Sequence, residues 1–133
     1  MERDDRRQEL ESFYRRYNRH CNDHLFDQLG MFVAESVEID GEQRGLAGYI
    51  AALQSVVRAF PDYRWELRHL FVDGPWISAH FHDTGTHQGS FLGVPATGRA
   101  VSTQEFAMYR VQDGKIAEVW GTADDLHLLD QLR

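Results

Sequence analysis

The sequence predicts an α+β fold in which helices pack on a curved, mainly antiparallel sheet. In the first part of the chain the apolar residues recur at the helical spacing of about 3.6, and after Pro61 they alternate at the strand spacing of about two. Helices followed by a strand meander are typical of an α+β layout. The length of 133 residues suits one domain spanning residues 1–133 and leaves little room for a second.

The part of the chain before Pro61 is expected to hold three helices and one strand. The first helix covers about residues 3–21, and a short second helix ends near Gly30. Residues 31–39 form a strand, and residues 45–60 form the clearest helix, with apolar side chains on one face. Pro61 ends that helix because proline disfavours the helical conformation of the residue before it.

Four antiparallel strands are expected to follow, with hairpin turns at two Asp-Gly pairs. Their expected ranges are 63–72, 76–86, 100–111 and 115–123. By strand alternation, one face of the first strand is aromatic and is expected to point inward. That face carries Tyr63, Trp65, Leu67, His69 and Phe71.

The composition excludes several classes of partner. A formal net charge of −7 leaves no basic surface for phosphate backbones or anionic lipids, so neither nucleic acid nor a membrane is expected. Residues 2–7 are mostly charged and lack the apolar core of a signal peptide, and Cys21 alone cannot form an intrachain disulfide. We therefore expect a cytoplasmic protein.

Several short motifs follow one another in the second half of the chain. They are Phe60-Pro61-Asp62, Gly85-Thr86-His87-Gln88-Gly89, the run from Leu92 to Arg99, and Arg110-Val111-Gln112-Asp113-Gly114-Lys115-Ile116. Each is weak alone, but their order and spacing resemble those of the SnoaL-like polyketide cyclases of the nuclear transport factor 2-like superfamily. The resemblance runs from about Phe60 to Leu132, with a further match at Arg44-Gly45-Leu46.

This resemblance implies a cone-like barrel, in which three N-terminal helices pack on a strongly curved sheet around an apolar cavity. It implies a cofactor-independent enzyme of aromatic polyketide biosynthesis that closes a ring of a hydrophobic, polycyclic substrate by general acid/base catalysis. It also implies pairing through the outer face of the sheet into a homodimer or larger homo-oligomer. Two alternatives stay open: a cofactor-free hydroxylase of a polycyclic polyketide, and a non-catalytic domain for small-molecule binding or dimerisation.

The chain departs from the family at the acid/base positions. The resemblance places the family's acid/base aspartate at Gly121 and two family histidines at Ala107 and Val119. On the neighbouring strand, Glu105 would then be the only carboxylate on two otherwise neutral strand faces. Ring closure by aldol chemistry needs a base beside a carbonyl and a donor for the developing oxyanion. Glu105 is therefore the candidate acid/base group.

Two residues are candidates to assist Glu105, and each candidate has a competing interpretation. Asp83 could reach the mouth of the cavity, and His69 could donate a hydrogen bond or shuttle a proton. Glu105 could instead pair with an arginine or face solvent through a strand bulge. We favour a surface position for Asp83, because charged residues are seldom buried, and a core histidine bonded to a neighbour is the commoner role for His69.

Other residues are candidates for contact with a substrate. They are Tyr14, Tyr17, Tyr49, Trp65, Phe81, Thr103, Val119 and Gly121. Aromatic residues at these spacings are more often simply part of a core. His80 and His82 share one strand face, but no third ligand is apparent, so no metal site is expected. His87 is interpreted as structural, and Asp124 as the cap of a short closing helix.

Overall fold

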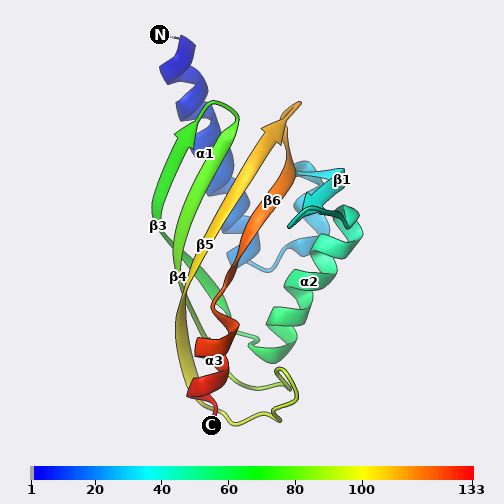
Figure 1. The fold of residues 1–133 in the computed structure, drawn as a ribbon, viewed down its shortest axis with the longest axis vertical. Helices are drawn as coiled ribbons and strands as arrows, with labels where there is room; N and C mark the ends of the chain where they lie inside the picture. The colour runs from blue at the N-terminus through cyan, green and yellow to red at the C-terminus, as the bar shows by residue number, and fades with distance from the viewer. Residues whose placement is uncertain (1) are drawn as a thin grey trace.

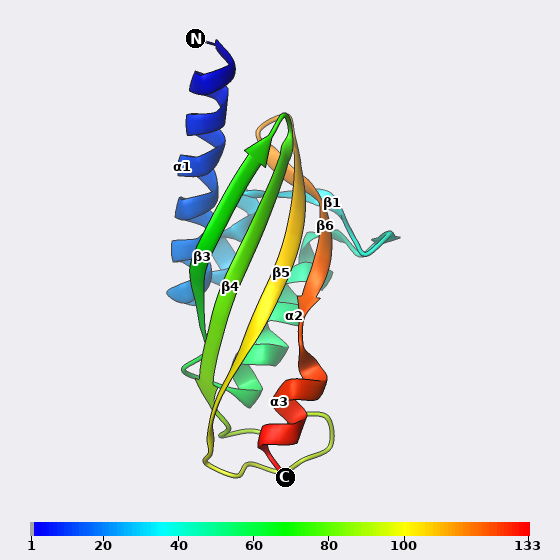
Figure 2. The ribbon, with the colours of Figure 1, turned by 60° about the vertical axis from the view of Figure 1, so that its left-hand side comes forward.

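The computed structural model describes residues 2–133, apart from the side chain of Thr122, and shows the α+β fold expected from the sequence (Figure 1). The helices α1 and α2 lie against one face of a curved sheet, and α3 closes the chain near one end of it (Figures 1 and 2). The sheet is open, with different strands at its two edges, so the cone is not a closed barrel.

The helical segments agree with the sequence pattern to within two residues at most ends. They are α1 (Glu2–Asn22), the 3-10 helix η1 (Phe26–Met31), α2 (Gly45–Ala59) and α3 (Asp125–Gln131). The cap expected at the closing helix is confirmed, because Asp124 Oδ1 accepts a hydrogen bond from His127 N at 3.0 Å. Within residues 2–133, no helix is long and apolar enough to cross a membrane.

Six strands form one sheet in the order β2-β1-β6-β5-β4-β3. They are β1 (Val33–Ile39), β2 (Glu42–Gln43), β3 (Arg64–Asp73), β4 (Trp76–Thr86), β5 (Ala100–Gln112) and β6 (Lys115–Ala123). β1 runs parallel to β6, and the other neighbours are antiparallel. The two-residue strand β2 was not expected, and it follows the turn that leaves β1.

A bulge in β3 reverses the faces of half of this strand. Leu67 pairs with Phe81, but His69 pairs with His80, so one extra residue lies in β3 between the two pairs. The expected aromatic inner face therefore ends at Leu67. The expectation that His69 and Phe71 point inward is wrong: both are exposed, and Phe71 retains 67% of its accessible surface.

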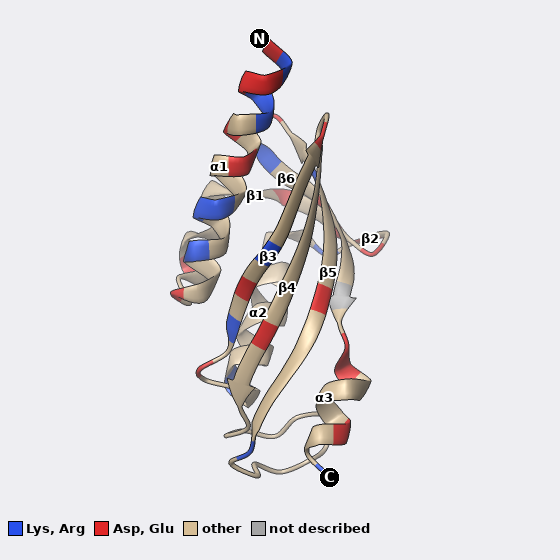
Figure 3. Cartoon of the chain, turned by 90° about the vertical axis from the view of Figure 1, so that its left-hand side faces the viewer, with Lys and Arg blue, Asp and Glu red and all other residues tan. Residues whose placement is uncertain are grey.

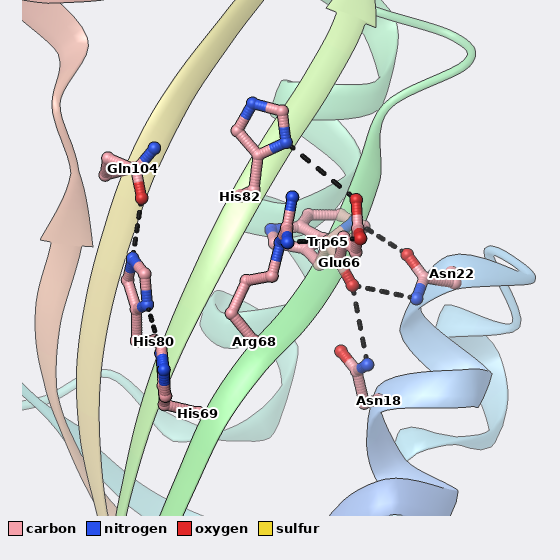
Figure 4. A network of polar contacts seen from close by, with 9 residues as sticks. All are labelled: Asn18, Asn22, Trp65, Glu66, Arg68, His69, His80, His82 and Gln104. Atoms are coloured by element: carbon pink, nitrogen blue, oxygen red, sulfur yellow. Dashed lines mark hydrogen bonds and ion pairs between the residues drawn. The ribbon is translucent and has the colours of Figure 1, made fainter.

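Side chains of α1 hold the edge strand β3 at the level of Trp65. Asn22 Oδ1 accepts a hydrogen bond from Trp65 N at 2.7 Å, and Asn22 Nδ2 donates to Trp65 O at 3.0 Å (Figure 4). Asn18 Nδ2 adds a longer contact to the same carbonyl at 3.4 Å. The outward backbone N–H and C=O of Trp65 on this edge strand are thus satisfied, and the Trp65 side chain lines the inner face.

The loop between β4 and β5 is attached to the core through His87. This side chain is fully buried, and its Nδ1 accepts a hydrogen bond from Thr97 N at 3.1 Å. The structural interpretation of His87 is therefore confirmed. Gly89 lies so close to the end of α2 that an added Cβ would be 2.2 Å from Arg58 O, which explains a glycine there.

Candidate active site

The inner face of the sheet and the helices α2 and α3 enclose a cavity of about 270 Å³. Most of its lining is apolar or aromatic, with contributions from α2, β3, β5, β6 and α3. Its volume lies just below the range of about 300–1,000 Å³ typical of small-molecule sites. The cavity can therefore hold a compact apolar ligand.

Glu105 is half-buried on β5 and lines this cavity, as the family resemblance implied. Its β4 partner in the antiparallel register is Phe81, which lies on the same inner face. Burial raises the pKa of the Glu105 carboxyl well above its ordinary value of 4.5, and the neighbouring Asp83 carboxyl raises it further. Both effects favour the protonated form of Glu105.

Asp83 lies directly behind Glu105, in the core rather than on the surface that we favoured for it. Its side chain is fully buried, and its register partner is Thr103, so Asp83 and Glu105 are diagonal neighbours on β4 and β5. Figure 3 shows acidic positions on both of these strands. Asp83 Oδ2 accepts a hydrogen bond from the Tyr63 hydroxyl at 2.7 Å.

The two carboxyls influence each other's pKa. Burial raises the pKa of Asp83, while the nearby Glu105 and the hydrogen bond from Tyr63 partly oppose that rise. Asp83 Oδ1 has no hydrogen-bond partner among the described residues. Glu105 is nevertheless close enough to change the pKa of the Asp83 carboxyl. Two like charges close together in one apolar site disfavour each other, so the pKa of Glu105 is raised both by burial and by Asp83.

The remaining ionisable groups at the cavity are acidic as well. Asp125 and Asp40 line it, and among the described residues no lysine, arginine or histidine does. The pKa of Asp125 is raised by burial and by the neighbouring Asp124. Asp125 in turn raises the pKa of Glu105. This lining favours a neutral or cationic ligand over an anionic one.

The candidate substrate-binding residues fall into three groups. Tyr49, Trp65, Val119 and Gly121 line the main cavity. Tyr14, Tyr17 and Phe81 instead line a smaller chamber that adjoins it, to which Tyr49 and Trp65 also contribute. Thr103 lines neither space: it is buried against α3, where its Oγ1 lies 3.3 Å from His127 Nδ1.

Gly121 occupies a position on β6 where the backbone admits no side chain. Its φ is +112°, and an added Cβ would lie 2.1 Å from Phe106 O on β5. Its N–H donates to Asp40 Oδ1 at 3.1 Å. The prediction that a family aspartate corresponds to Gly121 stays a prediction, but an aspartate could not replace this glycine without local rearrangement.

His69 lies on the outer face, away from the cavity. Its Nδ1 is 2.9 Å from His80 Nδ1, and His80 Nε2 is 2.6 Å from Gln104 Oε1 (Figure 4). The prediction that His69 assists Glu105 inside the cavity is therefore wrong, because the β3 bulge turned this residue outward. Among residues 2–133 no three metal-ligating side chains are grouped together, so His80 and His82 have no third ligand beside them.

Two site residues were not singled out from the sequence. Tyr63 was placed on the aromatic inner face, but its hydrogen bond to Asp83 depends on strand register that the sequence does not reveal. Asp125 follows the cap residue of α3, and only the docking of that helix brings it to the cavity.

A model of the family described as SnoaL-like polyketide cyclase matches residues 11–132. The chain belongs to this family. It is 33% identical over 84 residues to the aklanonic acid methyl ester cyclase of Streptomyces peucetius, a match covering 62% of this chain and 58% of that protein. The nogalonic acid methyl ester cyclase of Streptomyces nogalater is 33% identical over 73 residues, 55% of this chain and 51% of that protein. The chain thus spans little more than half the length of these curated relatives.

Solved structures agree with this membership. A SnoaL-like polyketide cyclase from Agrobacterium tumefaciens superimposes with a TM-score of 0.83 at 32% identity, covering 93% of this chain and 98% of that one. A candidate hydroxylase from Streptomyces galilaeus has a TM-score of 0.82 at 24% identity, covering 94% of this chain and 96% of that one, a likeness that shows the fold alone. The resemblance seen in the sequence motifs is confirmed.

Proposed function

We propose that this protein is a cofactor-independent cyclase-type enzyme that closes a ring of a hydrophobic, polycyclic polyketide by acid/base catalysis, with Glu105 as the proton-transferring group. The observation that carries the proposal is the pair of Glu105 and Asp83 in a largely apolar cavity. Glu105 reaches the cavity, whereas Asp83 is fully buried behind it. Asp83 is therefore a positioning residue, which holds the proton on Glu105.

The pair can complete a ring closure without a net change in its protonation. An enol carbon of the substrate forms the new carbon–carbon bond with a carbonyl carbon. The carbonyl oxygen takes the proton held by Glu105, and the enol hydroxyl, as it becomes a ketone, returns a proton to the Glu105 carboxylate. The substrate is isomerised, and the pair regains its starting state.

Membership of the cyclase family supports the reaction class, and the relatives supply a first substrate to test. The names of the relatives from Streptomyces refer to methyl esters of polyketide acids. An esterified acid carries no negative charge, which suits a cavity whose ionisable lining is acidic. Biosynthesis of an aromatic antibiotic is the setting that these relatives suggest.

The test is turnover of aklanonic acid methyl ester, followed by chromatography of the cyclised product. Acid/base groups contribute roughly 10²–10⁴-fold to a rate, so Glu105→Gln should lower kcat by at least about 100-fold. Glu66→Gln, on the exposed outer side of β3, is the matched control and should keep wild-type turnover. Full turnover by Glu105→Gln would overturn the role of Glu105. Oxygen consumption during that turnover would indicate the hydroxylase alternative, and ligand binding without turnover the binding-domain alternative.

We further propose that two copies of the chain pair through the outer face of the sheet. Four large apolar side chains on β3, β5 and β6 are exposed there: Phe71 (67%), Phe106 (62%), Met108 (45%) and Trp120 (40%). His80 stacks on Phe106 with ring centroids 4.6 Å apart, which extends the patch. A contiguous apolar sheet face of this kind is typical of a protein–protein interface.

A further inference from the structure

A chamber of about 30 Å³ lies between α1, α2 and the sheet, next to the main cavity. Five residues line both spaces, among them Glu105, Tyr49 and Trp65. The carboxyl that the proposed chemistry uses therefore borders a second, much smaller space. Its other walls include three phenol rings, those of Tyr14 and Tyr17 on α1 and of Tyr109 on β5.

One hydroxyl in the chamber wall has no partner. Tyr14 is fully buried on α1, and its hydroxyl makes no hydrogen bond among the described residues. Tyr17 and Tyr49 hydrogen-bond to each other across the same chamber. The Tyr109 ring lies beside Tyr14, with centroids 4.9 Å apart, and Tyr109 acts on the Tyr14 oxygen as a donor, which partly lowers the pKa that burial raises. The Tyr14 O–H itself still has no acceptor among the described residues. Leaving a buried hydroxyl without a hydrogen bond costs about 1–3 kcal/mol, so a ligand atom that accepts a hydrogen bond from Tyr14 would be stabilised there.

The size and charge of the chamber limit what that acceptor can be. A water needs roughly 10–15 Å³ of such space, so the chamber admits one or two oxygen-sized groups and no ring. A carboxylate would meet the carboxyls of Glu105 and Asp83, which disfavours an anion. A neutral oxygen, from a carbonyl group or from water, fits both limits.

We propose that the chamber is an oxygen-binding subsite, in which a carbonyl oxygen of the ligand accepts a hydrogen bond from the Tyr14 hydroxyl beside Glu105. This inference rests on the proposed function in one respect, that the ligand of the main cavity is a polycycle bearing carbonyl groups. It assigns to Tyr14 the role of a donor to the substrate, and it fixes the orientation of the ligand with one carbonyl toward α1. A donor at this position would also stabilise negative charge that develops on the oxygen.

The test compares fluorenone with fluorene, a tricyclic ketone and a hydrocarbon of similar shape, by quenching of tryptophan fluorescence. Wild-type protein should bind fluorenone more tightly. Tyr14→Phe removes only the hydroxyl, and should reduce the preference for the ketone by about threefold to tenfold while leaving the Kd for fluorene unchanged. Glu66→Gln, on the exposed outer side of β3 and outside the lining of both spaces, is the control and should not reduce the preference. Thermal unfolding checks that Tyr14→Phe folds, and its Tm should not fall, since an unsatisfied group is removed.

Three outcomes would overturn the subsite. The first is that the wild type binds fluorenone no more tightly than fluorene. The second is that Tyr14→Phe weakens the affinity for both ligands equally. The third is a crystal structure with fluorenone in which water occupies the chamber and the carbonyl lies elsewhere. The last would identify a site for water alone. None of these results depends on turnover, so failure of the subsite is distinguishable from failure of the cyclase proposal, which the Glu105→Gln kinetics decide.

Discussion

Replacing Gly121 with alanine should destabilise the protein strongly, because the backbone of β6 leaves no space for a side chain there. The added Cβ would lie 2.1 Å from Phe106 O and 2.8 Å from Ala107 Cα, both backbone atoms of β5. Ala107 is the register partner of Gly121, so the clash can be relieved only by moving two hydrogen-bonded strands apart. The φ of +112° adds strain for any residue with a Cβ.

The size of the effect follows from these two causes. Strained backbone of this kind costs roughly 1–3 kcal/mol, and forcing volume into a packed site costs roughly another 1–3 kcal/mol. The sum of roughly 2–6 kcal/mol is a large part of the roughly 5–15 kcal/mol by which a domain is stable. At roughly 3–5 °C per kcal/mol for a domain of this length, the Tm should fall by at least about 6 °C.

Thermal unfolding followed by circular dichroism measures this change, and Gly114→Ala separates its two causes. Gly114 has a φ of +79°, but an added Cβ meets nothing within 4 Å, so this control carries backbone strain without a clash. It should lose only about 1–2 kcal/mol. A Gly121→Ala variant as stable as Gly114→Ala would refute the reasoning. The same clash should prevent Gly121→Asp from simply restoring the acid/base aspartate that the family resemblance places there.

Three further predictions concern Glu105, Tyr63 and the outer face. Because the pKa of Glu105 is raised in the folded state, its protonated carboxyl contributes stability that is present below the unfolded pKa of 4.5 and is lost as pH rises through the folded pKa. Between about pH 5 and 8 the Tm of Glu105→Gln should therefore fall less than the Tm of the wild type, and an equal fall of the two Tm values with pH would contradict this. Tyr63→Phe removes the donor to Asp83 Oδ2, which should cost about 1–3 kcal/mol in chemical denaturation; an unchanged midpoint would argue against the bond. Phe106→Glu should convert dimers to monomers in light scattering, whereas Leu126→Glu, 73% exposed on α3, should not; a monomeric wild type would exclude the dimer.

The sequence predicted the elements well because each has a local signal. The range expected for β4 is the observed Trp76–Thr86, and that for β6 is the observed Lys115–Ala123. Asp-Gly pairs place both hairpin turns, since Gly74 and Gly114 adopt positive φ values that glycine tolerates. The extra residue in β3 has no such signal. It moved His69 from the expected inner face to the outer one, because strand alternation has a period of two and one insertion reverses it.

Only part of the candidate site could be predicted from the sequence, because the sequence does not give the strand register. Glu105 could be found because the family resemblance directs its strand face into the cavity, and that face is otherwise neutral. Asp83 was a candidate to assist Glu105, but their proximity could not be derived, since it depends on the register that sets Thr103 opposite Asp83. The general rarity of buried carboxyls then favoured the wrong, exposed position for Asp83.

Because carboxyls are seldom buried, the burial of Glu105 and Asp83 is the strongest argument that this pair has a function. Burial raises the pKa of both carboxyls, which means that the fold is less stable with them charged than it would be with neutral residues of the same shape. Among residues 2–133 neither carboxyl forms an ion pair that would offset this cost, although His80 and His82 partly lower the pKa of Asp83. A structural role would be served as well by a glutamine and an asparagine. The proposed proton transfer to a ligand would account for two carboxyls beside an apolar cavity, because amides cannot perform it.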